Sequence, residues 1–96
     1  MVSKTKHGLK KLETLAKELG YTVRYEKGNF TSGYALVESR RMAIVNKFYD
    51  TEGRVNVLLD ILSQYRGKRA EDPELSKPSK KLWKALRPFL GIQEEE

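Results

Sequence analysis

Apolar residues near the start of the chain recur every three or four positions, which is the period of an amphipathic helix. The stripe consists of Leu9, Leu12, Leu15, Ala16 and Leu19. Ser3 or Thr5 is placed to cap the start of this helix, and Gly20 can adopt the left-handed conformation that ends one. The pattern predicts an N-terminal surface helix with one buried stripe.

The pattern then changes to alternation of apolar and polar residues, which is the period of a half-buried strand. Strands are predicted at residues 21–26, 34–38 and 42–45. Short connections favour antiparallel neighbours, so we expect a three-stranded antiparallel meander. Unbroken apolar runs at 35–37 and 42–45 indicate that both faces of the sheet are at least partly covered.

A central helix is predicted over residues 52–66, with Asp50 or Thr51 as its cap and Gly67 as its stop. Its apolar residues cover about 200° of the helical wheel. They are Val55, Val57, Leu58, Leu59, Ile61, Leu62 and Tyr65. So wide an arc is typical of a helix that is buried and contacted on two sides.

A polar linker over residues 66–78 precedes a last helix that is expected to start near Ser79. Its predicted buried residues are Leu82, Leu86 and Phe89, with Trp83 and Leu90 at the rim. Pro88 lacks an amide proton, so the helix should end or kink near Arg87. Residues 92–96 are expected to form a frayed acidic tail.

Together these elements predict an α+β fold in a single domain over residues 1–96. A chain of 96 residues buries only ~60–65% of its unfolded surface, which excludes barrels and complete dinucleotide-binding folds. It has no cysteine and one histidine, which excludes disulfides, Cys-based metal sites and paired-histidine ligation. We expect no cofactor, no metal and no catalytic residues.

No apolar run is long enough to span a membrane, so a cytoplasmic location is expected.

The formal net charge of +6 directs attention to a basic region near the end of the chain. Residues 66–87 contain eight basic and three acidic residues. The candidate contact residues are Arg66, Lys68, Arg69, Lys80, Lys81, Lys84 and Arg87. Such a field can attract nucleic acid or an anionic protein, or it can be an ordinary solvated face. No nucleic-acid-binding motif accompanies the charge.

Three other positions are candidates for special roles. Phe30 stands in a predicted loop at 27–33, where a large apolar side chain needs a pocket or a partner. Asp60 is a carboxylate on the narrow polar side of the central helix, and without a catalytic partner it should face water or accept hydrogen bonds. His7 is expected to be exposed and inactive. The tyrosines of the strands are interpreted as core residues and not as a stacking platform.

Part of the chain resembles the ImmA/IrrE-type zinc metallopeptidases. Residues 12–21 resemble the opening helix of that family, 42–46 a strand, and 54–63 the helix that carries HExxH. The two histidines of that motif are replaced by Leu59 and Ser63, and Asp60 stands where its glutamate belongs. The resemblance implies the shell of that fold without its zinc site.

A second resemblance covers residues 33–48, 52–54 and 58–62, which are similar to a family of bacterial proteins of about this length with no assigned function. It implies a fold and no activity. The resulting hypothesis is a non-enzymatic cytoplasmic binding or adaptor domain for a protein partner. The alternatives are a nucleic-acid-associated protein, a degenerate metallopeptidase-like domain, and self-association through an exposed sheet edge.

Overall fold

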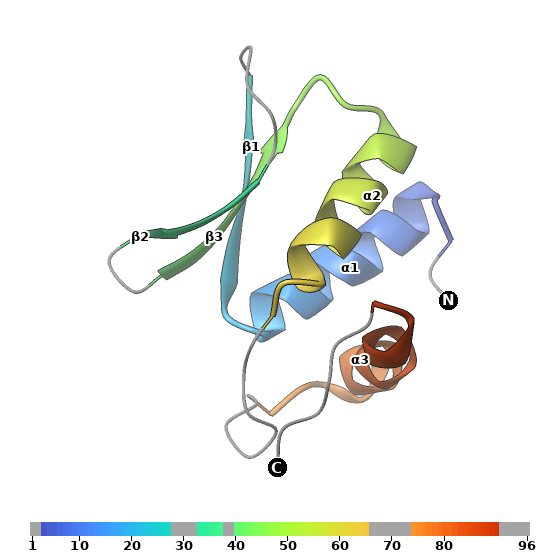
Figure 1. Cartoon of the computed structure of the whole chain (residues 1–96). Helices are drawn as coiled ribbons and strands as arrows, with labels where there is room; N and C mark the ends of the chain where they lie inside the picture. Colours follow the sequence, from blue (N-terminus) through green and yellow to red (C-terminus); the bar gives the residue numbers. More distant parts are fainter. Residues whose placement is uncertain (1–2, 28–32, 38–39, 66–73, 91–96) are drawn as a thin grey trace.

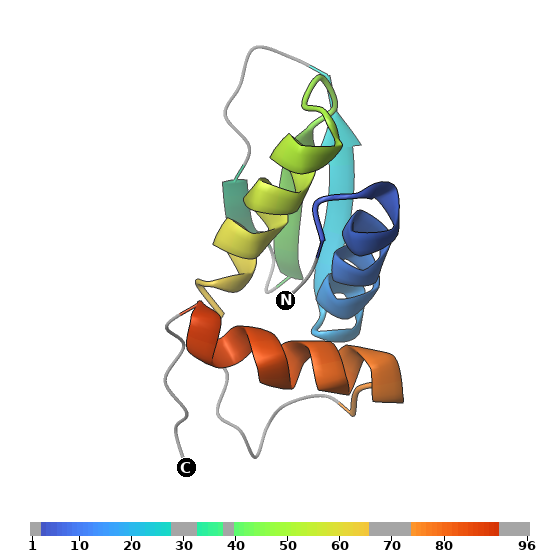
Figure 2. The same ribbon diagram turned by 90° about the vertical axis from the view of Figure 1, so that its right-hand side faces the viewer.

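The computed structural model describes residues 3–27, 33–37, 40–65 and 74–90, with the backbone alone for 33–37 and 40. The fold is α+β, as predicted. Its elements are α1 (Lys6–Glu18), β1 (Tyr21–Glu26), β2 (Gly33–Val37), β3 (Arg40–Asn46), α2 (Thr51–Leu62) and α3 (Lys77–Phe89). The three described helices lie on one side of the sheet, and α3 runs across the ends of α1 and α2 (Figures 1 and 2).

The strand order is β1-β3-β2, so the prediction of an antiparallel meander is wrong. Strand β3 pairs in parallel with β1, with Val23 opposite Ala43, and antiparallel with β2. The most apolar strand takes the central position, where Ala43 and Val45 are fully buried. The two-residue connection between β2 and β3 joins antiparallel neighbours, as expected for a short loop. The connection between β1 and β2 has six residues, which is long enough for β2 to pair on the far side of β3.

The sheet has one covered face among the described elements. Tyr21 is buried and Val23 half-buried on the side of the helices, whereas Thr22 and Arg24 are exposed on the other side. All described helices lie on the first side (Figure 1). On the second side Met42 and Ile44, which lie opposite Thr22 and Arg24, are half-buried, so this face is partly covered although no described helix lies against it.

Helix α1 begins and ends at the predicted signals. The Thr5 side chain accepts a hydrogen bond from the Gly8 amide at 3.2 Å and caps the helix. Gly20 follows the helix with a φ of +97°, a conformation that a residue with a Cβ adopts at a cost. The predicted apolar stripe is buried along its whole length.

Helix α2 forms the centre of the core. The Asp50 carboxylate accepts a hydrogen bond from the Gly53 amide at 2.8 Å, which confirms Asp50 as the cap. The helix ends at Leu62, four residues earlier than predicted. Its buried residues are Val55, Leu58, Leu59, Ile61 and Leu62. The narrow polar side faces solvent, with Asn56 and Asp60 exposed.

Helix α3 is rotated relative to the prediction. Trp83 is 3% exposed and packs edge-on against Tyr65, with ring centroids 5.5 Å apart, whereas Phe89 is 61% exposed. Burying the indole removes more apolar surface from water than burying the phenyl ring would. The helix also starts two residues before Ser79 and continues through Pro88 to Phe89, so it ends two residues after Arg87, near which an end or a kink was predicted.

Two arginines complete the packing around Trp83. The Arg41 guanidinium lies 4.9 Å from the centre of the Tyr65 ring, and the Arg87 guanidinium lies 5.5 Å from that of Trp83. Arg41 also donates a hydrogen bond to the Leu19 carbonyl at 3.2 Å. These contacts join β3, the end of α2 and α3, and fix how α3 sits beneath α1.

Within the described residues, no helix is both long and apolar enough to cross a bilayer.

Candidate binding cleft

The start of α3 is held by a carboxylate from α1. Glu18 accepts hydrogen bonds from the Ser76 amide at 2.6 Å, the Ser76 hydroxyl at 2.9 Å and the Ser79 hydroxyl at 2.7 Å. Helix α3 has no acidic residue in its first turn, and its Ser76 side chain makes no cap hydrogen bond of its own. The negative charge at this N-terminus is therefore supplied by another helix.

These hydrogen bonds favour the charged form of Glu18. The backbone N–H of Ser76, followed by the Ser79 hydroxyl, holds the pKa of the Glu18 carboxyl below its usual value and outweighs desolvation. The group is consequently an anion at neutral pH. We call this arrangement of Glu18, Ser76 and Ser79 the Glu18 clamp.

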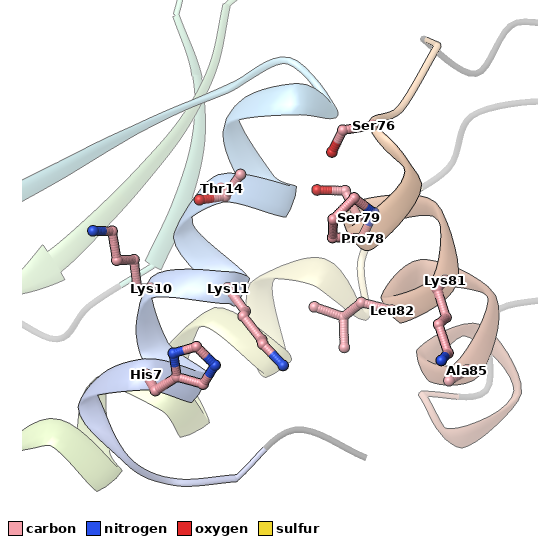
Figure 3. A pocket seen from close by; sticks show the side chains of 10 residues that line it. All are labelled: His7, Lys10, Lys11, Thr14, Ser76, Pro78, Ser79, Lys81, Leu82 and Ala85. Carbon is pink, nitrogen blue, oxygen red and sulfur yellow. The ribbon is translucent and has the colours of Figure 1, made fainter.

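Beside the clamp, a cleft of about 500 Å³ lies between α1 and α3 (Figure 3). The residues lining it are His7, Lys10, Lys11, Thr14, Ser76, Pro78, Ser79, Lys81, Leu82 and Ala85. Its size is in the range of small-ligand sites in proteins, and is enough for a short segment of another chain.

The two walls of the cleft differ chemically. Helix α1 contributes His7, Lys10 and Lys11, whose side chains are exposed, whereas α3 contributes the apolar groups of Leu82, Ala85 and Pro78 and one exposed lysine, Lys81. Figure 3 shows the side chains of Lys11 and Leu82 extending toward each other from the two helices. A cationic wall facing an apolar wall is suited to a ligand that is itself amphipathic and anionic.

The two ends of the cleft also differ. The side chains of Ser76 and Ser79 lie at one end (Figure 3), where their hydroxyl groups are hydrogen-bonded to Glu18. His7 and Lys11 lie toward the other end, and Lys81 comes from α3 on the opposite side (Figure 3). The basic side chains His7, Lys11 and Lys81 therefore lie away from the end at which Glu18 holds Ser76 and Ser79.

No family model, curated protein or solved structure matches this chain. The function of the chain is therefore inferred from its own residues and their arrangement.

The predicted basic region is only partly found on this surface. Lys80, Lys81 and Lys84 are exposed on α3, and Lys81 lines the cleft. Arg87 does not belong to this face, because it is 7% exposed and stacks on Trp83. Of the remaining candidates, Arg66, Lys68, Arg69 and Phe30 lie outside the described residues.

The α1 wall was missed from the sequence, although its spacing carries a signal. His7, Lys11, Thr14 and Glu18 are three or four residues apart and therefore share one flank of the helix. That spacing identifies a stripe but not its neighbour. Helix α3 faces this stripe only in the folded structure, and the sequence pattern does not indicate that contact.

The positions that align with a zinc-binding motif have other surroundings. Leu59 is buried in the core, and the Ser63 hydroxyl donates a hydrogen bond to the Asp60 carbonyl. Over the described ranges, no cluster of three or more His, Asp or Glu residues is placed to hold a metal ion. The resemblance to the metallopeptidase shell stays a prediction.

Proposed function

We propose that this chain is a non-enzymatic binding domain whose α1–α3 cleft takes a carboxylate-bearing segment of a partner protein. The observation that carries the proposal is the pairing of a lysine wall with an apolar wall in one cleft. Carboxylates of the segment would pair with Lys11 and Lys81, while its apolar side chains would cover Leu82 and Ala85. Both contributions are needed, because exposed ion pairs alone are weak.

A protein partner is favoured over nucleic acid by three features of the cleft. Among the residues that the structure describes, its lining includes no Phe, Tyr or Trp on which bases could stack. The apolar wall offers nothing to a phosphate backbone. The amide donor at the α3 N-terminus, a common site for phosphate, is already taken by Glu18.

Charge reversal inside and outside the cleft tests the proposal. We expect the double variant Lys11→Glu, Lys81→Glu to lose about tenfold in affinity for an acidic probe, since two attractive pairs become repulsive. The matched control is Lys17→Glu, Lys84→Glu, which changes one exposed lysine on each helix outside the lining. Each variant lowers the formal net charge from +6 to +2 (6 − 4).

The probe is a capped hexapeptide of two glutamates followed by four apolar residues, titrated by NMR against each protein. Thermal unfolding of both variants establishes that they remain folded. Equal losses in the two variants would contradict the cleft as the binding site. Tight binding of short duplex DNA, weakened equally by both variants, would instead support the nucleic-acid alternative.

A further inference from the structure

We infer that the cleft selects ligands with one-sided charge: carboxylates at the His7 and Lys11 end, and uncharged hydrogen-bond donors at the Ser76 and Ser79 end. The inference rests on the proposed function and specifies the partner of that same cleft. It depends on the Glu18 clamp, whose carboxylate lies directly behind Ser76 and Ser79 at one end of the cleft.

The two ends are separated by a distance that a short segment can span. Lys11 and Glu18 are seven residues apart on α1. At 1.5 Å per residue this is about 10 Å, and two turns bring both residues to the same flank. A ligand lying along the cleft thus has Lys11 at one end and, at the other, Ser76 and Ser79 with the Glu18 carboxylate behind them.

The clamp consumes the donors at its own end. The Ser76 amide, the Ser76 hydroxyl and the Ser79 hydroxyl all donate to the Glu18 carboxylate. A serine hydroxyl has one proton, so these two oxygens have only acceptor positions left. Ser79 is 4% exposed and has little room to turn its hydroxyl elsewhere.

A ligand group at that end must therefore donate. A second carboxylate there would meet a like charge and no free proton from the clamp. A hydroxyl or an amide N–H would instead find acceptor oxygens. The middle of the cleft, with Pro78, Leu82 and Ala85, takes apolar side chains.

Two capped hexapeptides of identical composition test the inference on the unmodified protein. Each contains two glutamates, three apolar residues and one serine. In the first, both glutamates are at one end and the serine is at the other; in the second, one glutamate stands at each end and the serine is in the middle. We expect the first to bind about fivefold more tightly at low salt, which is the effect of one like-charge contact at the protein surface.

Glu18→Gln identifies the cause of the preference. Gln retains a carbonyl acceptor for the Ser76 amide but carries no charge, so the substitution removes the charge of the clamp and keeps this hydrogen bond. We expect the preference between the two peptides to fall below about twofold in this variant, while Lys17→Glu leaves it unchanged.

The outcomes separate the two proposals. Equal binding of both peptides to the unmodified protein overturns the charge-selection inference and leaves the proposed function standing. No binding of either peptide overturns both. A preference that persists in folded Glu18→Gln protein overturns the role of the clamp.

Discussion

Glu18 is placed where its charge is unfavourable for its own helix and favourable for another. It is the last residue of α1, and a negative charge at a helix C-terminus opposes the macrodipole. At α3 the same carboxylate meets the N-terminus of a helix whose first turn carries Lys77 and Lys80 and no acid. The contact thus stabilises the docking of α3 on α1 more than either helix alone.

The lowered pKa of Glu18 predicts how stability changes with pH. A carboxyl whose pKa is lower in the folded state than in the unfolded chain stabilises the fold above its unfolded pKa, and this contribution is lost as pH falls through the folded pKa. We therefore expect the wild type to lose more stability than Glu18→Gln between about pH 6 and about pH 3. Urea unfolding at both pH values measures this difference.

The comparison with Glu18→Gln isolates one group, because every other carboxyl titrates in both proteins. The same pH dependence in the two proteins would contradict a charged clamp. At neutral pH, Glu18→Ala should cost about 1–2 kcal/mol, since it leaves the buried Ser79 hydroxyl without its acceptor.

The orientation of α3 shows what helical period leaves undecided. Its sequence contains two apolar stripes that share Leu86, one through Leu82 and Phe89 and one through Trp83 and Leu90. Period alone fits both. The choice is made by Tyr65, a residue outside any helix, whose ring receives the edge of Trp83. Sequence patterns therefore predicted the helix and the burial of Leu86 correctly, but exchanged the positions of Trp83 and Phe89.

Substitutions of Trp83 test this orientation. The indole N–H has no hydrogen-bond partner among the described residues, so Trp83→Phe loses no polar contact there and keeps a ring against Tyr65. We expect Trp83→Phe to change the free energy of unfolding by at most about 1 kcal/mol, and Trp83→Ala to cost about 3–5 kcal/mol because it empties a buried site.

Far-ultraviolet circular dichroism during urea unfolding is the appropriate measurement, since Trp83 is the one tryptophan of the chain. Phe89→Ala serves as the control and should be nearly neutral, because Phe89 is 61% exposed. A small effect of Trp83→Ala, or a large effect of Phe89→Ala, would indicate that α3 buries the other stripe.

At the scale of the whole molecule, the sequence predicted local features and missed the contacts between distant segments. The helix caps follow from single residues such as Thr5 and Asp50, and the burial of α2 follows from the apolar residues along that helix. The order of the strands and the packing of α3 beside α1 depend on how segments far apart in the sequence bury their apolar surfaces against one another. The cleft belongs to this second class, and of its basic residues only Lys81 was predicted.

The net charge of +6 leads to a last prediction, on salt dependence. Helix α3 exposes Lys77, Lys80, Lys81 and Lys84, so any anion is attracted over a distance comparable with the Debye length. A carboxylate segment held partly by the apolar wall should lose only about two- to fivefold in affinity between ~50 and ~200 mM salt. Four phosphate contacts would lose roughly a hundredfold over the same range, because each releases counterions.

Titrating the one-sided hexapeptide and a short duplex DNA at both salt concentrations distinguishes binding of a carboxylate segment from binding of nucleic acid. Because the peptide carries only two carboxylates, its dependence should be shallow, and a steep one would contradict binding through Lys11 and Lys81.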